Sequence, residues 1–225
     1  MEGKEERLLK KQFVVIGLGR FGSAVCRELN MLGNEVLAID MNEDRVNNMI
    51  NDSTTAVVAN VTDENALKTL GIRNFDLAIV AIGEDMQSSI HCTLLLKEMG
   101  IVVWVKAQNS YHHKILEKIG ADRVIHPEQD MGIRVAHQLN SENIIDFIEL
   151  SKDYSILELK ATEKINQKSL IQLDIRAKYG CTILAIKRGE QINISPLPND
   201  ILHQGDTLVV MGSNLDLQRF EEKGL

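Results

Sequence analysis

Short apolar runs alternate with longer amphipathic stretches through the first 125 residues of the chain. The first apolar run, 13–16, enters a glycine-rich turn, and the second, 35–40, ends in an aspartate. Apolar runs of this length, bounded by turn signals, are typical of buried strands, whereas the amphipathic stretches are typical of helices. Regular alternation of the two predicts parallel strands joined by helices.

This pattern predicts the elements of the first domain. The expected strands are 13–16, 35–40, 55–60, 75–82, 102–107 and 122–125, and the expected helices are 23–32, 42–50, 63–70, 86–99, 112–119 and 127–139. Asn42 stands before two acidic residues and is expected to cap its helix. The fold class is therefore α/β, with a Rossmann-like, doubly wound parallel sheet.

Beyond residue 140 the apolar runs become shorter and the long helical stretches end. Expected strands are 154–159, 182–187, 191–195 and 207–211, and a closing helix is expected at 214–222. The stretch 143–150 has an apolar face at either period, so its state stays open. We therefore expect a nucleotide-binding domain over 1–140, a connector over 141–152 that buries one face, and a small α+β domain over 153–225.

The glycine-rich turn has the spacing of a dinucleotide-binding motif. Gly17 would permit the tight turn, Gly19 would let the backbone approach a phosphate, and Gly22 would let the following helix pack against the strand. The positive end of that helix would then face the phosphates. Asp40, 18 residues after Gly22, stands where a carboxylate accepts hydrogen bonds from ribose hydroxyls. A Rossmann-type core that has lost its ligand would keep the same pattern.

The turn also contains Arg20 and Phe21, which we count among the candidate binding residues. The guanidinium of Arg20 is expected to reach a phosphate, in its own site or across an interface. The alternative for Arg20 is a solvated residue at the start of the helix. Asp40 narrows the choice of ligand, because its charge would repel the 2′-phosphate of NADP.

Three more strand ends supply candidates, because the carboxyl edge of such a sheet is where ligands lie. They are Asn60 and Thr62 after the third strand, Ala81, Ile82 and Gly83 after the fourth, and Lys106 at the end of the fifth. The 81–83 tail can pack on an adenine ring or simply end its strand. Lys106 is either solvated or in reach of a phosphate.

Composition limits the possible partners. With 25% charged residues, a net charge of −7 and no lysine- and arginine-rich stripe, the chain is not expected to bind a nucleic acid polymer. No apolar stretch approaches the roughly 18 residues of a membrane span, and residues 1–7 lead into no signal-peptide region. We therefore expect a cytoplasmic protein. The three cysteines follow no metal-ligand spacing and are expected to be buried, reduced thiols.

No catalytic constellation accompanies the nucleotide motif. A dehydrogenase needs a proton donor and acceptor near its nicotinamide, and no tyrosine here has a lysine four residues later. His112 and His113 are adjacent, lack metal-ligand spacing and are expected at the surface. We expect no enzyme activity, while an NAD(H)-binding redox sensor or an NAD-dependent oxidoreductase remains the alternative.

Several motifs, in order along nearly the whole chain, resemble a known family. They are QFVVIGLGRFG at 12–22, LGIRNFD at 70–76, WVKA at 104–107, LEKIGAD at 116–122 and HPE at 126–128, with IRAKYG at 175–180 and GD at 205–206 in the second domain. The first five resemble the RCK (KTN) gating domain in regulatory subunits of Ktr-type potassium uptake systems. The last two resemble the RCK C-terminal (TrkA-C) domain.

The resemblance implies a function for the whole chain. It implies a cytosolic homo-oligomer, with dimers assembled into a ring that is usually an octamer, held at the inner face of the membrane by a potassium-translocating subunit. It implies ATP or ADP at the glycine turn, with NAD(H) in related members. Arg20 matches an arginine that reaches a neighbouring subunit's γ-phosphate, and Lys106 matches a second phosphate contact. Glu128 matches an acid associated with a divalent cation (Mg or Ca), which needs a symmetry-related second carboxylate.

The same resemblance implies a second ligand, cyclic di-AMP, across a dimer interface of the C-terminal domain. Leu170, Ile175, Arg176 and Pro198 stand at matching places. Thr182 stands where some relatives have asparagine. The native ligand among ATP, ADP and NAD(H) stays open at this point.

Overall fold

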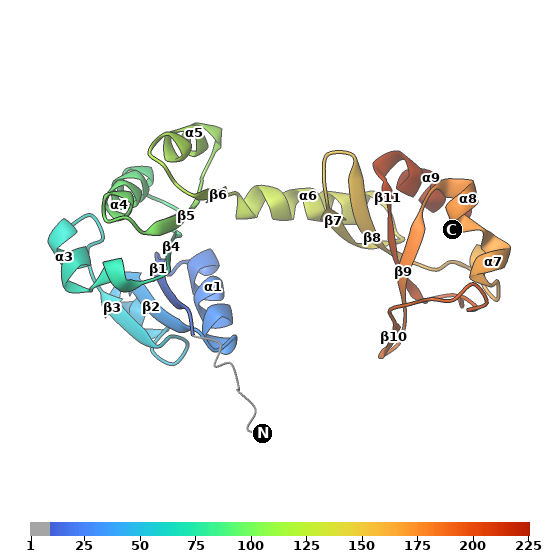
Figure 1. Cartoon of the computed structure of the whole chain (residues 1–225), viewed down its shortest axis with the longest axis horizontal. Helices are drawn as coiled ribbons and strands as arrows, with labels where there is room; N and C mark the ends of the chain where they lie inside the picture. Colours follow the sequence, from blue (N-terminus) through green and yellow to red (C-terminus); the bar gives the residue numbers. More distant parts are fainter. Residues whose placement is uncertain (1–9) are drawn as a thin grey trace, which may run out of the picture. The chain divides into compact units, whose positions relative to one another are not determined.

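The computed structural model describes residues 10–225. Residues 1–9, and with them the expectation about the start of the chain, lie outside the described residues. The chain forms two compact units that divide between Pro127 and Glu128. Figure 1 shows a helix-covered sheet in the first and a separate sheet in the second.

The first unit is built on a parallel sheet of β1 (Gln12–Ile16), β2 (Glu35–Asp40), β3 (Thr55–Val58), β4 (Leu77–Val80), β5 (Val102–Lys106) and β6 (Arg123–Ile125). The strand order β3-β2-β1-β4-β5-β6 is that of a doubly wound Rossmann sheet, which confirms the predicted fold class. The register pairs Val14 with Leu37 on one side and with Ala78 on the other. The order reverses next to β1, so the turn after β1 lies at the topological switch point.

Helices cover both faces of this sheet (Figure 1). They are α1 (Arg20–Met31), α2 (Glu43–Asn47), α3 (Glu64–Thr69), α4 (Met86–Glu98) and α5 (Ser110–Lys118), with a short 3₁₀ turn, η1 (Ile72–Asn74). One core contains Cys26 of α1 and Val46 of α2. The other contains Leu67, Leu96 and Leu116, from α3, α4 and α5. The two cores together bury both faces of the central strands.

The helices begin directly after their N-cap residues, and the apolar pattern predicts these starts less accurately. Asn42 caps α2 as predicted, with its side chain accepting a hydrogen bond from the Arg45 N–H. Asn109 caps α5 in the same way, so this helix begins earlier than the expected 112. Helix α1 begins at Arg20, directly after Gly19, and not at 23.

All of α6 (Pro127–Asn140) except its first residue belongs to the second unit. The helix has no buried residue, and β7 (Ile144–Glu149) follows it in the chain. The Arg134 guanidinium forms a two-pronged ion pair with Asp146, which holds the pKa of that carboxyl below its usual value. The His137 ring stacks on Phe147 with centroids 3.9 Å apart. Helix α6, which we expected in the first domain, thus contacts the second sheet through Arg134 and His137.

The stretch whose state the sequence left open, within the expected connector 141–152, contains strand β7. It belongs to an antiparallel sheet with β8 (Tyr154–Lys160), β9 (Thr182–Arg188), β10 (Gln191–Asn193) and β11 (Thr207–Ser213), in the order β10-β9-β11-β8-β7. The second unit also contains η2 (Glu163–Ile165), α7 (Leu170–Leu173), α8 (Ile175–Tyr179) and α9 (Asn214–Gly224). Phe220 of α9 packs into a core with Leu159 and Leu208. The predicted small α+β domain is therefore present.

Candidate nucleotide site

The turn after β1 is held between the ends of β2 and β4. Gly17 has a φ of +91°, a conformation that favours glycine, and its N–H donates to the Ile39 carbonyl oxygen at 2.8 Å. A Cβ atom at Gly17 would lie 3.0 Å from the backbone of Ala81 and Ile82. The turn therefore approaches the end of β4 too closely for a side chain.

Gly22 lies in a closely packed position, whereas Gly19 lies beside open space. A Cβ atom at Gly22 would lie 1.9 Å from the Gly17 carbonyl oxygen, so the first turn of α1 packs directly on the glycine turn. A Cβ atom at Gly19 would meet no described atom within 4 Å. Gly19 is the N-cap of α1 and provides no side-chain cap, so the amide groups that begin the helix lie beside open space. This is the geometry that a phosphate requires.

Asp40 fixes the turn as well as standing at the end of β2. The carboxylate is 8% exposed and accepts hydrogen bonds from the Leu18 N–H at 2.7 Å and the Asn42 N–H at 2.9 Å. The Arg45 guanidinium lies 3.6 Å from its Oδ2 atom. Each carboxylate oxygen can still accept a further hydrogen bond, as a ribose hydroxyl would need. The spacing of the motif predicted the position of Asp40 but not its hydrogen bonds to the turn, nor the neighbouring Arg45.

The other sequence candidates of the first unit lie at the same edge of the sheet. Asn60 and Thr62 follow β3, and the Asn60 side-chain oxygen accepts from the Thr62 N–H at 3.1 Å and its hydroxyl at 2.8 Å. These bonds fix the orientation of the Asn60 amide. Gly83 follows β4, and the Lys106 Nζ atom lies 3.5 Å from the position that a Gly83 Cβ would take. The strand ends of β1 to β5 thus gather the candidates at one edge.

Four candidates of the second unit have exposed or partly exposed side chains, and the fifth is buried. Leu170 begins α7 and Pro198 lies in the loop after β10; the neighbouring Ile171 N–H donates to the Pro198 carbonyl oxygen at 2.8 Å. Arg176 is exposed on α8, and Thr182 begins β9. Ile175, by contrast, is 5% exposed and packs in the core of the unit. Its side chain anchors α8 and offers little surface to a ligand.

Glu128 stands in the first turn of α6. In residues 10–225, no group of three or more histidine, cysteine, aspartate or glutamate side chains has an arrangement that would hold a metal ion. Within the described part of one chain, Glu128 therefore belongs to no such group, and a divalent cation at this residue stays a prediction.

The adjacent histidines differ from the expectation of two surface side chains. His112 is fully buried at the start of α5, where burial lowers the pKa of its ring and the charge of His126 adds a smaller effect. His113 is half-buried and lies 2.7 Å from a ring nitrogen of His126. The prediction was wrong for His112 because this residue lies on the face of α5 that the rest of the first unit covers. The cysteines are buried and unbridged as predicted, and burial raises the pKa of Cys92 to about 12.

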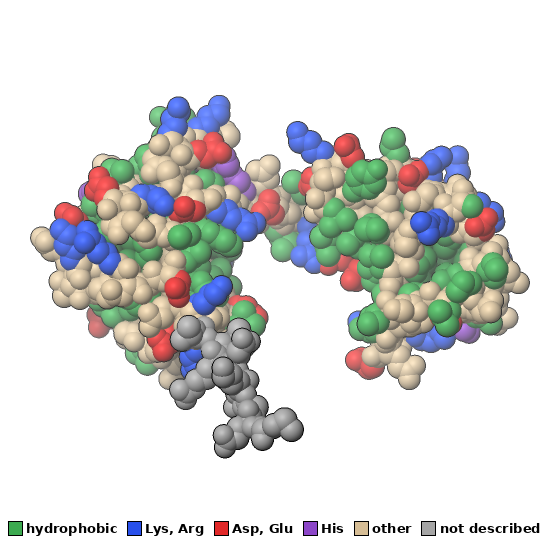
Figure 2. Space-filling view, viewed as in Figure 1, with side chains coloured by type: hydrophobic (Ala, Val, Ile, Leu, Met, Phe, Trp, Pro, Cys, Tyr) green, Lys and Arg blue, Asp and Glu red, His purple; other side chains and the backbone are tan. Residues whose placement is uncertain are grey.

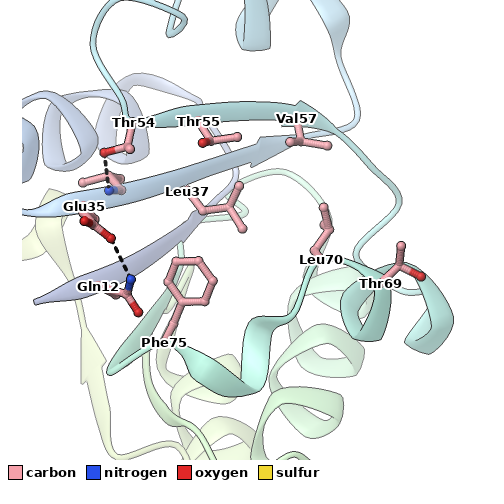
Figure 3. A pocket seen from close by; sticks show the side chains of 10 residues that line it. Gln12, Glu35, Leu37, Thr54, Thr55, Val57, Thr69, Leu70 and Phe75 are labelled. Atoms are coloured by element: carbon pink, nitrogen blue, oxygen red, sulfur yellow. Dashed lines mark hydrogen bonds between the residues drawn. The ribbon is translucent and has the colours of Figure 1, made fainter.

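A pocket of about 340 Å³ lies at the amino-terminal ends of β1 to β3 (Figure 3). The glycine turn lies at the other end of β1, after Ile16. The Phe75 ring points into it beside Leu37 and Leu70, and Gln12 donates to Glu35 at its rim. The end of α3, at Thr69 and Leu70, forms part of its wall. We place the candidate nucleotide site at the opposite edge, where the turn, the acid and the helix end coincide.

The face shown in Figure 2 has no patch of one charge that would indicate a second binding site. Lysine and arginine side chains lie interspersed with aspartate and glutamate there, without a continuous basic stripe. In the described range, 10–225, no helix has the length and apolar character needed to cross a membrane.

A parallel sheet with this turn and strand-end acid, followed by a small antiparallel-sheet domain, defines a two-domain protein of the Rossmann type. The TrkA-N domain family matches residues 13–127, and the TrkA-C domain family matches residues 155–223. The chain therefore belongs to the family of proteins with a TrkA-N and a TrkA-C domain.

Relatives cover the chain almost from end to end. It is 57% identical to "Ktr system potassium uptake protein A" of Bacillus subtilis (strain 168), over 97% of this chain and 99% of that protein. It is 51% identical to "Ktr system potassium uptake protein C" of the same organism, over 96% and 99%. The structure of the GsuK channel bound to NAD aligns with a TM-score of 0.53 at 24% identity, over 95% of this chain and 38% of that one. This last likeness bears on the fold alone.

Proposed function

We propose that the chain is the cytosolic regulatory subunit of a Ktr-type potassium uptake system and that ATP and ADP switch it from the glycine-turn site. The observation that carries the proposal is the turn itself: open space at Gly19, the uncapped start of α1 and the buried Asp40 carboxylate lie at one strand edge. The full-length similarity to Ktr potassium uptake proteins supports the physiological role. We assign no reaction to the site.

The partner in this proposal is a membrane subunit that translocates potassium. The chain would lie at the cytoplasmic face of the membrane through that partner, as dimers assembled into an octameric ring. A divalent cation enters the proposal only where two copies each bring a Glu128. The family resemblance supports these points.

A ring suits a switch of this kind energetically. A ligand shifts an equilibrium only by its difference in affinity for the two states. Moving a population from 1:99 to 99:1 takes about 5.5 kcal/mol. A charge-assisted hydrogen bond to the γ-phosphate contributes about 1.5–3 kcal/mol, so several subunits acting together are needed.

We also propose that cyclic di-AMP binds the second unit at Leu170, Arg176, Thr182 and Pro198, with Ile175 holding α8 in place. Exposed Arg176 is suited to a phosphate, and the bond between Ile171 and Pro198 brings α7 and the loop together. The family resemblance supports the choice of ligand.

Calorimetric titration of the full chain with ATP, ADP, NADH and cyclic di-AMP, with light scattering for mass, tests both proposals. We expect ATP and ADP to bind an octamer-sized particle and cyclic di-AMP to bind separately. Exclusive binding of NADH to a dimer would overturn the switch and favour an NAD(H)-binding redox sensor or an oxidoreductase.

Replacing Arg20 with alanine should reduce the advantage of ATP over ADP by about tenfold to hundredfold, because the guanidinium is assigned to the γ-phosphate. ADP affinity should change much less. The measurement is titration of the assembled oligomer with both nucleotides. Arg27→Ala is the matched control, since Arg27 lies on the same helix with its guanidinium 2.7 Å from Asp52. Equal losses for ATP and ADP would refute the assignment.

Replacing Arg176 with alanine should weaken cyclic di-AMP binding by about tenfold or more while ATP binding stays unchanged, because the two sites lie in different units. Titration of the variant with each ligand separates the two effects. Lys187→Ala removes another exposed cation of the same unit and should leave both affinities unaltered. Undiminished cyclic di-AMP affinity in Arg176→Ala would remove Arg176 from the site.

A further inference from the structure

The loop after β10 contains a turn, 197–200, that one carboxylate closes. The Asp200 Oδ2 atom accepts from the Leu197 N–H at 2.8 Å and from the Asn193 side-chain amide at 2.8 Å. The Asp200 N–H donates back to the Leu197 carbonyl oxygen at 2.9 Å. Pro198 lies inside this turn, so its position depends on the two bonds to Oδ2.

The same turn is joined to the start of α7 through the backbone. The Leu170 N–H donates to the Asp200 carbonyl oxygen at 3.1 Å, and the Ile171 N–H donates to the Pro198 carbonyl oxygen at 2.8 Å. A capping box between Ser169 and Gln172 satisfies the next amide of the helix. The carbonyl oxygens of Pro198 and Asp200 therefore hold the turn against the first residues of α7.

The residues around Asp200 are more exposed than Asp200 itself. Leu197 is 65% exposed and Ile171 is 63% exposed, whereas Asp200 is half-buried. The turn and α7 thus display apolar side chains that could lie against a flat purine ring, while the carboxylate is engaged by its own loop.

We propose that Asp200 is a positioning residue for the cyclic di-AMP site. Its carboxylate keeps Pro198 beside Leu170 and does not touch the ligand. This inference rests on the proposed second ligand of this unit. The role is geometric, because a carboxylate close to the ligand would repel phosphates and its charge would oppose binding. Removal of the two bonds would release the turn from α7 and misalign the two residues.

Titration of the full chain with cyclic di-AMP, with ATP as the internal comparison, tests the role. D200A should weaken cyclic di-AMP by about tenfold, since two hydrogen bonds that shape the turn are lost. D200N should stay within about twofold of the unmodified chain, because an amide oxygen can accept both bonds from the Oδ2 position. ATP affinity should be unchanged in both. N199A is the matched control, since the Asn199 side chain makes no hydrogen bond to any residue in 10–225 that the structure records.

The variants separate the possible explanations. Thermal unfolding identifies a merely destabilised second unit, because D200A would then unfold at a lower temperature than D200N and the unmodified chain, and the loss of cyclic di-AMP binding would follow from unfolding. A repelling carboxylate would give tighter binding in both D200A and D200N; either result overturns the inference. Unchanged cyclic di-AMP affinity in D200A would also overturn it while leaving the proposed ligand intact. No binding to the unmodified chain would overturn the proposed ligand and this role together. If D200A does not fold, N193A removes one donor to Asp200 and should show the same selective loss at smaller size.

Discussion

Replacing Gly22 with alanine is expected to lower nucleotide affinity more than about hundredfold and to destabilise the first unit by about 1–3 kcal/mol. The added Cβ would lie 1.9 Å from the Gly17 carbonyl oxygen, a separation that real side chains do not adopt. Either the turn or α1 must move, and both form the phosphate end of the site. Titration with ATP and ADP, together with thermal unfolding, measures the two effects.

Two glycines provide controls for this variant. Gly132→Ala lies in α6, where a Cβ would meet no described atom within 4 Å, and should leave nucleotide affinity unaltered without destabilising the chain. Gly19→Ala also meets open space, so it should leave stability within about 0.5 kcal/mol yet weaken nucleotides, because the methyl group would enter the proposed phosphate position. Wild-type ATP affinity in Gly22→Ala would contradict the proposed site.

Replacing Asp40 with alanine is expected to weaken ATP and ADP by about hundredfold and to cost about 1–3 kcal/mol of stability. The Leu18 N–H would lose the acceptor 2.7 Å away in a buried position, so the glycine turn would lose an anchor. The ribose hydroxyls would lose their proposed acceptor as well. Asp52→Ala, which removes a half-buried acid paired with Arg27, is the control and should leave nucleotide affinity unaltered.

The two roles of Asp40 can be separated with 2′-deoxy-ATP. The unmodified chain should bind ATP more tightly than 2′-deoxy-ATP if the carboxylate accepts a hydrogen bond from the 2′-hydroxyl. The Asp40→Ala variant should bind both weakly and about equally. A preference for ATP of the same size in both proteins would show that Asp40 acts only by holding the turn, and the ribose assignment would fall.

Much of the first unit could be predicted from the sequence because its signals are local. A buried parallel strand is a short apolar run whichever strand it pairs with, so all six strands were located. The glycine spacing predicted the turn because a positive φ at Gly17 and the close packing of Gly22 leave room for no side chain. The cap at Asn42 was predictable for the same reason, since its partner is only three residues away.

The features that were missed depend on partners distant in sequence. Burial of His112 depends on which face of α5 the rest of the unit covers, and the residues near His112 in the sequence do not say which face that is. The connector expectation missed β7 because an apolar face at either period does not distinguish a strand from a helix. The hydrogen bond from Leu18 to Asp40 joins residues 22 apart and leaves no mark in the spacing.

By itself, the sequence determined the fold class, the six strands of the parallel sheet and the glycine turn of this protein, because each follows from hydrophobic periodicity or from a backbone conformation that one residue type permits. Only the tertiary structure decided that α6 belongs with the second sheet, through Arg134 and Asp146, and that Asp40 and Asp200 each hold a turn in place. These arrangements depend on hydrogen-bond partners brought together by folding. A buried carboxylate must find such partners, but its place in the sequence does not say which.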